Sequence, residues 1–154
     1  MKFSKRIFLI LTLLFSCLIF SQDTSKIIGE WTGKDYTGNE GKFIFYDDNF
    51  ASMTISGEFI DGKNYKINGG KNDGKTAMLK YIVDYSTNPI SIDFIALLLE
   101  NKKEVEKGRI LAIAKFISDS EMKLSISITG KRDKDFNVEN FENTIVLKRT
   151  NSLQ

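Results

Sequence analysis

Gly29-Glu30-Trp31 is the stretch that decides how this chain is read, because it holds the only tryptophan among 154 residues. The segment that begins with these residues continues to Tyr36. It is followed by Thr37-Gly38-Asn39-Glu40-Gly41, which is typical of a turn. We therefore expect the first strand over residues 29–36, with Trp31 near its start. A large aromatic side chain at that point predicts a substantial contribution to a hydrophobic core.

Outward from this strand, the chain predicts further short strands separated by turns rich in Gly, Asn and Asp. Apolar residues alternate with Ser, Thr or Lys over 50–57 and again over 121–129, which is the pattern of half-buried strands. A charged tip is expected at residues 101–107. The nine expected strands cover residues 29–36, 42–46, 50–57, 63–68, 78–85, 90–99, 109–117, 121–129 and 142–149.

This pattern contains no convincing long helix, and it predicts an all-β fold. We expect an antiparallel up-and-down β-barrel of about eight or nine strands, with a β-sandwich as the alternative. Neither a repeat nor a linker divides the segment 22–154, so one domain is predicted there.

The first 21 residues have the anatomy of a secretory signal peptide. Lys2, Lys5 and Arg6 precede an apolar run, and the sequence becomes polar after Ser21. We expect cleavage near Ser21 and an exported, periplasmic or secreted, domain over 22–154. A lipoprotein anchored at Cys17, the only cysteine, is the less favoured alternative. The apolar run is too short for a comfortable membrane span, which needs about 20 residues.

The composition excludes several classes of chemistry. The chain contains no histidine, and its one cysteine lies in the predicted signal peptide, so Ser-His, Cys-His and histidine-metal sites are ruled out. The 22 basic and 20 acidic residues nearly balance, and the slight basic excess disappears with the signal peptide. We therefore expect no nucleic-acid partner, no cofactor and no catalysis.

One segment matches a nucleotide-binding motif. Gly69-Gly70-Lys71-Asn72-Asp73-Gly74-Lys75-Thr76 fits the P-loop pattern, in which Lys75 would contact phosphates and Thr76 would hold magnesium. A P-loop follows a buried parallel strand and opens a helix, whereas this segment lies between two predicted strands. We expect a hairpin loop here and no nucleotide.

Two groups of carboxylates invite a functional interpretation. The segment from Asp133 to Glu139 starts like a calcium-binding EF-hand loop, but Val138 stands at the position that needs glycine. We therefore expect a solvated loop and no metal. Asp84 and Asp93 lie in predicted strands, and paired carboxylates can hydrolyse glycosides without histidine. We expect these two to point outward or to mark strand ends.

The chain resembles the lipocalin-like superfamily, whose barrels open their first strand with G-x-W. The family's arginine near the end of the last strand packs on that tryptophan, and Arg149 occupies the corresponding position. More specifically, the chain is similar to small secreted bacterial lipocalin-like domains of unknown function, which also carry a P-x-x-I-D step, here Pro89 to Asp93. The resemblance implies a structural clamp of Gly29, Trp31 and Arg149 at the closed end of the barrel. Cytosolic fatty-acid-binding barrels insert two helices where this chain has only the turn 37–41.

The leading functional expectation is a barrel that encloses a small, largely apolar ligand. The alternative is a structural or interaction domain with a filled core, acting through its loops or an exposed sheet face. The aromatic residues that would either line or fill the barrel are Phe43, Phe45, Tyr46, Tyr81, Tyr85 and Phe94. The ligand's identity and the oligomeric state are left open by the sequence.

Overall fold

The computed structural model describes residues 24–151 except 56 and 128. The predicted signal peptide (residues 1–21), its cleavage position near Ser21 and the alternative anchor Cys17 therefore lie outside the described residues. Within the described part of the chain, no helix is long and apolar enough to cross a membrane.

The described residues form ten strands and three short 3-10 helices. The helices are η1 (Thr24–Ile27), η2 (Gly70–Asn72) and η3 (Phe141–Asn143). The strands are β1 (Gly29–Lys34), β2 (Glu40–Phe45), β3 (Ala51–Ile55), β4 (Glu58–Ile60), β5 (Tyr65–Lys66), β6 (Thr76–Asp84), β7 (Ile90–Glu100), β8 (Lys103–Ser118), β9 (Glu121–Ile126) and β10 (Thr144–Asn151).

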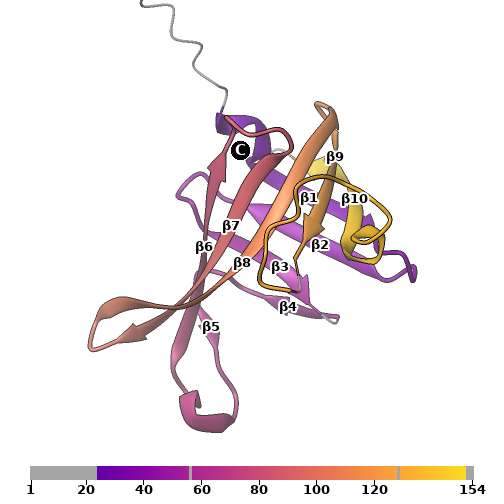
Figure 1. Ribbon diagram of the computed structural model, residues 1–154. Helices are drawn as coiled ribbons and strands as arrows, with labels where there is room; N and C mark the ends of the chain where they lie inside the picture. The colour runs from indigo at the N-terminus through magenta and orange to yellow at the C-terminus, as the bar shows by residue number, and fades with distance from the viewer. Residues whose placement is uncertain (1–23, 56, 128, 152–154) are drawn as a thin grey trace, which may run out of the picture.

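These strands form one antiparallel sheet in the order β4-β3-β2-β1-β10-β9-β8-β7-β6-β5. Strands that follow one another in sequence are neighbours, except β4 and β5, which form the two edges of the sheet. The pairing of β1 with β10 joins the first strand to the last. The sheet curls into a nearly closed barrel (Figure 1). The predicted all-β, up-and-down barrel is thus confirmed, and the β-sandwich alternative is excluded because one continuous sheet surrounds the core.

The barrel closes between β3 and β6 through scattered contacts. An isolated bridge joins Phe50 to Lys80 at one point of this seam. Beside it, the amide of Gly62 donates to the buried Ser52 hydroxyl at 2.9 Å, and the Gly62 carbonyl accepts from the amide of Leu79 at 2.7 Å. A Cβ at Gly62 would lie 1.6 Å from a β3 carbonyl oxygen, so only glycine fits into this seam.

The core lies inside the barrel and follows the alternation of each strand. Inward side chains are apolar and outward ones are mostly polar, as the pleat requires. On β9, for example, Met122 and Leu124 are buried while Lys123 is exposed. The largest fully buried side chains that the strands contribute to this core cluster are Trp31, Phe45, Phe94, Ile92, Met122, Leu124 and Leu147.

The sequence prediction differs from the structure at two places. Strand β4 was not expected, because its three residues are too short to show a period. The predicted charged tip at residues 101–107 is also wrong, since β8 begins at Lys103 and pairs with β7 up to the tip. The turn consists only of Asn101 and Lys102, both with positive φ, as a type I′ hairpin turn requires.

This end of the β7–β8 hairpin extends away from the barrel together with the β5–β6 hairpin (Figure 1). We call these two extensions the arm. A bulge between Ala96 and Leu97 marks the point where β7 enters it. Within the arm, the Glu100 carboxylate pairs with Lys75 at 3.2 Å and with Lys107 at 3.0 Å. The charges that suggested a loop therefore belong to paired strands exposed to water.

Candidate functional site

The structure brings the three predicted clamp residues together at one end of the barrel. Trp31 and Arg149 are direct partners across β1 and β10, and the Arg149 guanidinium carbon lies 4.2 Å from the centre of a Trp31 ring. Trp31 is fully buried. Gly29 has a φ of 132°, a backbone conformation that favours glycine, and it begins β1 directly opposite Phe45.

Helix η1 covers this end, and the clamp residues hold it in place. The Arg149 guanidinium donates to the carbonyl oxygens of Lys26 and Ile28, each at 2.5 Å. The Trp31 indole nitrogen donates to the carbonyl of Ile27 at 2.8 Å, and the Ile27 side chain is 1% exposed. One arginine and one tryptophan therefore satisfy three carbonyls at the start of the domain. We call this region the closed end.

The middle of the barrel is filled by side chains. Phe45 contacts Tyr81 edge-on at 5.1 Å between ring centres, and its ring lies 5.9 Å from that of Phe94. These rings and Phe43 are at most 5% exposed, so they belong to the packed core. Among the other aromatic candidates, Tyr46 and Tyr85 are only partly buried and lie outside the core cluster.

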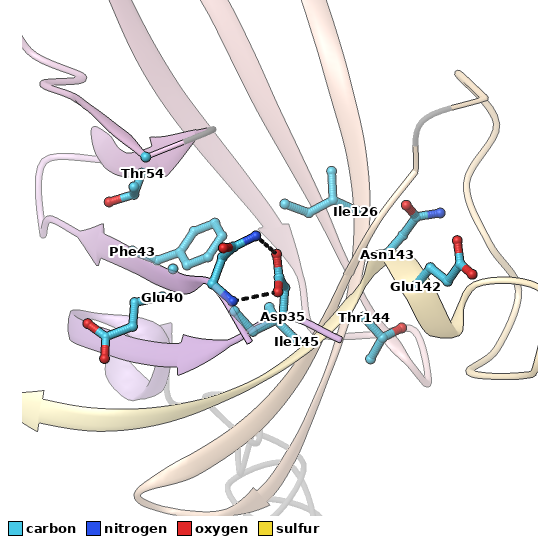
Figure 2. Close-up of a pocket in the computed structure, with 12 residues that line it drawn as sticks. Asp35, Glu40, Phe43, Thr54, Ile126, Glu142, Asn143, Thr144 and Ile145 are labelled. Carbon is cyan, nitrogen blue, oxygen red and sulfur yellow. Dashed lines mark hydrogen bonds between the residues drawn. The ribbon is translucent and has the colours of Figure 1, made fainter. Parts of the chain in front are cut away.

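A cavity of about 800 Å³ lies at the opposite end of the barrel, which we call the mouth. Its walls come from the end of β1 and the start of β2, from the ends of β3 and β9, and from η3 with the start of β10. Figure 2 shows its labelled side chains around the central opening. Because β1 runs from the closed end to the mouth, the cavity and the clamp lie at opposite ends of the same strands.

The floor of the cavity is apolar. Phe43, Ile126 and Ile145 reach it from β2, β9 and β10. The Ile145 side chain lies against two facing glycines, since a Cβ at Gly41 would be 2.9 Å from its Cδ1 and one at Gly33 would be 3.2 Å from its Cγ1. These glycines therefore leave room for Ile145 to form the boundary between the packed core and the cavity.

The charged residues lining the cavity are carboxylates. Asp35, Glu40 and Glu142 come from the β1–β2 turn, from β2 and from η3, and Figure 2 shows Glu40 and Glu142 on opposite sides of Asp35. The Thr37 hydroxyl at 2.7 Å, together with amides of Thr37 and Asn39, lowers the pKa of Asp35. Asp35 therefore stays ionised at neutral pH.

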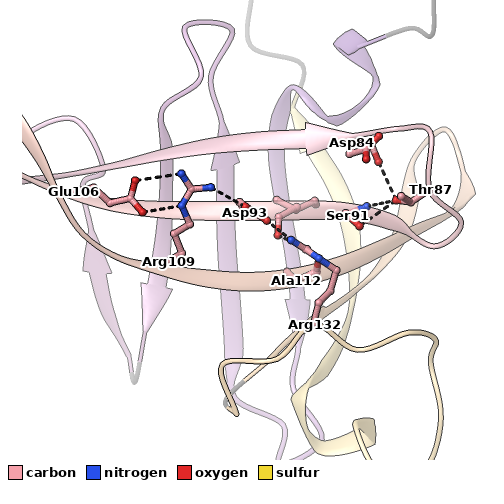
Figure 3. Close-up of polar contacts among 9 residues, drawn as sticks. Asp84, Thr87, Ser91, Asp93, Glu106, Arg109, Ala112 and Arg132 are labelled. Carbon is pink, nitrogen blue, oxygen red and sulfur yellow. Dashed lines mark hydrogen bonds and ion pairs between the residues drawn. The ribbon is translucent and has the colours of Figure 1, made fainter.

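The two strand carboxylates considered for catalysis have structural partners. Asp93 receives hydrogen bonds from Arg109 at 3.0 Å and from Arg132, which also donates to the carbonyls of Ile92 and Ala112 (Figure 3). Burial alone would raise the pKa of Asp93, but the bonds from the two arginines outweigh burial and lower it.

Asp84 ends β6 and caps its turn. The hydroxyl and amide of Ser86 bond to one carboxylate oxygen, at 2.6 and 2.9 Å, and these bonds lower the pKa of Asp84. A carboxylate pair that hydrolyses glycosides needs one member with a raised pKa to act as the acid. The pKa values of both carboxylates are lowered here, and each carboxylate is occupied by contacts within the fold, Asp84 with its turn and Asp93 with two arginines.

The P-loop-like segment forms the tip of the β5–β6 hairpin. The amide of Gly69 donates to the Asp73 carboxylate at 2.5 Å, Lys75 pairs with Glu100, and Lys66 donates to the Thr76 hydroxyl at 2.6 Å. The residues that would bind phosphate and magnesium thus contact other groups of the arm. The segment also leads into strand β6, whereas a P-loop leads into a helix.

The EF-hand-like segment belongs to the loop between β9 and β10. Asp133 accepts from the buried Ser125 hydroxyl at 3.2 Å, and the buried Asn140 side chain donates to the carbonyl of Asp135 at 2.7 Å. These bonds hold the loop against the barrel. Across the described residues, no group of three or more acidic or cysteine side chains is arranged to hold a metal ion.

Of the residues of the mouth, the sequence identified only Phe43 as a candidate to line or fill the barrel. Ile126, Ile145, Glu40 and Glu142 come from separate elements, and nothing in their local sequence distinguishes them from other strand and loop residues. Only the Asp35-x-Thr37-x-Asn39 turn carries a local signal, that of a carboxylate capping its own turn. Comparisons with protein-family models, with curated proteins and with solved structures find no match for this chain.

Proposed function

We propose that this protein is an exported lipocalin-like binding protein that holds a small, largely apolar ligand at the mouth of its barrel. The observation that carries the proposal is the cavity of about 800 Å³ with Phe43, Ile126 and Ile145 at its floor. Its volume lies within the range of about 300–1,000 Å³ that is typical of small-molecule sites. No catalytic step is proposed.

The lipocalin-like assignment is supported by the closed end. A G-x-W strand whose tryptophan packs under an arginine from the last strand is the feature on which the resemblance depends, and the contact of Arg149 with Trp31 agrees with it. The antiparallel order of the strands agrees as well. Export is supported by the apolar, basic-flanked start of the sequence.

The packed middle of the barrel determines where a ligand would bind. Phe45, Phe94 and Trp31 are completely buried, so side chains fill the closed end and the middle of the barrel, where larger barrels keep space for a ligand. Binding at the mouth requires no rearrangement of this core. The ligand would therefore contact the floor residues with its apolar part and would reach solvent at the rim.

A fluorescent probe tests this proposal. Diphenylhexatriene, a neutral apolar rod, becomes fluorescent when it leaves water, and we expect the purified protein to bind it saturably. Ile126→Trp places a bulky ring in the cavity and should weaken binding about tenfold or more, equivalent to about 1.4 kcal/mol or more. Ile117→Trp is the matched control, because Ile117 is 53% exposed on β8 and does not line the cavity.

Two outcomes would contradict the proposal. One is the absence of saturable binding to the unmodified protein, and the other is an equal effect of the two tryptophan variants. Circular dichroism and chemical denaturation of each variant establish that both remain folded. The alternative, an interaction domain with a filled core, would be favoured by the first outcome. Its surface would then include Val138 and Phe141, which are 91% and 64% exposed beside η3.

A further inference from the structure

The charge of the cavity wall is one-sided. Among the described residues that line it, Asp35, Glu40 and Glu142 are the charged ones, and neither lysine nor arginine takes part. Asp35 and Glu40 flank the β1–β2 turn and Glu142 belongs to η3; in Figure 2, Glu40 and Glu142 lie on either side of Asp35. A ligand in this cavity would therefore meet hydrocarbon at one end and negative charge at the other.

These carboxylates receive little compensation from cations of the protein. Asp35 is bonded to hydroxyl, amide and backbone donors of Thr37 and Asn39, which are all neutral. The Glu40 carboxylate lies 3.9 Å from the Lys34 ammonium, and both side chains are more than half exposed. Glu142 makes neither a hydrogen bond nor an ion pair with its side chain among the described residues.

Two carboxylates elsewhere, one on the barrel and one in the arm, contrast with this arrangement. Asp93 is held between two arginines, and Glu100 is held between two lysines at 3.2 and 3.0 Å. Their charge is therefore neutralised within the protein. At the mouth, Asp35 and Glu142 have no cationic partner among the described residues, whereas Glu40 also borders a neighbouring hollow lined by Lys34, Lys42 and Lys148. A cleft with apolar walls concentrates the field of the charges around it.

We infer that the ligand of the mouth cavity is a cationic amphiphile, with an apolar body on Phe43, Ile126 and Ile145 and an amine or quaternary ammonium group among Asp35, Glu40 and Glu142. This inference rests on the proposed function and adds the chemical class of the ligand. An anionic amphiphile of the same size, such as a fatty acid, would place its carboxylate among three others and is disfavoured.

Three probes with the same apolar body test the inference. Diphenylhexatriene carries no head group, its trimethylammonium derivative carries a cationic one and its propionic acid derivative carries an anionic one. At low salt, the unmodified protein should bind the cationic probe about threefold to tenfold more tightly than the anionic one, as expected for exposed charges. This ratio should approach one at high salt because ions screen exposed charges.

Neutralising the rim should remove the preference without removing the site. The double variant Glu40→Gln, Glu142→Gln should lower the ratio of the cationic to the anionic affinity by about threefold or more, with the affinity for the neutral probe unchanged. Glu139→Gln is the matched control, since it removes one loop carboxylate close in sequence to Glu142 but outside the cavity wall. It should leave the ratio as it is.

The outcomes separate this inference from the proposed function. Equal or tighter binding of the anionic probe would overturn the cationic preference while leaving a binding site in place. The same conclusion follows if the preference persists in the double variant. Failure of all three probes to bind would instead overturn the proposed function, and with it this inference.

Discussion

The two ends of the barrel use their polar groups in opposite ways. At the closed end, the donors of Arg149 and Trp31 meet the carbonyls of η1 and the first residues of the domain, and the indole is completely buried. At the mouth, Asp35, Glu40 and Glu142 border a cavity with little compensation from the protein's own cations.

This difference suggests a division of roles along the same strands. β1 carries Trp31 near one end and leads to Asp35 just beyond the other, so the clamp and the proposed binding cavity are separated by the length of one strand. Changes at the closed end should alter the free energy of unfolding and leave probe binding intact. Changes at the mouth should weaken probe binding and leave the free energy of unfolding nearly unchanged. The predictions below test that separation.

Trp31→Ala should produce the largest effect. Removing a fully buried indole leaves a cavity in the core and deprives the Ile27 carbonyl of its donor, so the free energy of unfolding should fall by about 3–5 kcal/mol. Chemical denaturation measures this change. Phe141→Ala, at a side chain that is 64% exposed, serves as the control and should change stability by less than about 0.5 kcal/mol. Comparable losses for both variants would show that Trp31 is not a special element of the closed end.

Arg149→Lys should have an intermediate effect. Lysine keeps the charge but lacks the planar fork that reaches the carbonyls of Lys26 and Ile28 together, so unfolding should become easier by about 2 kcal/mol. Lys148→Arg, on the outward face of the same strand, should leave stability nearly unchanged. Binding of diphenylhexatriene should be the same in both variants, and a weakened affinity in Arg149→Lys alone would contradict the separation of the two ends.

Replacing Asp93 should give the smallest change in the free energy of unfolding, and this change should depend on pH. Its pKa is lowered in the folded protein, so its contribution is fully present above the unfolded value of about 3.9 and is lost as pH falls toward the native value. Asp93→Asn should therefore cost about 1 kcal/mol at neutral pH and progressively less below about pH 4.

Denaturation of the Asp93→Asn variant and the unmodified protein between pH 2.5 and pH 7, about the range in which carboxylates titrate, measures this difference. Glu139→Gln, in an exposed loop, is expected to show a small difference at every pH. Because Arg132 attaches the loop that leads to Glu142, Asp93→Asn is also the stability variant most expected to affect the mouth. A difference in stability that does not change with pH would contradict the assigned ion pair.

The agreement between sequence and structure was greatest where local pattern governs conformation. The alternation in residues 50–57 and 121–129 predicted β3 and β9, and turn residues predicted most of the connections. Strand β4 was missed because a strand of three residues is too short to show the alternation of apolar and polar side chains. The start of β8 was misread as a loop because most of its residues are charged and exposed, and charged residues do not distinguish an exposed strand from a turn.

The sequence by itself determined the fold class and the chemistry that is excluded. Alternating apolar residues specify strands, and a chain without histidine cannot use it as a base or metal ligand. Only the tertiary structure decided that the aromatic rings fill the barrel and leave a cavity at its mouth. Ile126, Ile145, Glu40 and Glu142 meet there through strand register and barrel closure, which depend on contacts between segments far apart in the chain. Local sequence carries no direct record of those contacts, and for that reason it predicted the clamp's strands but not the cavity's walls.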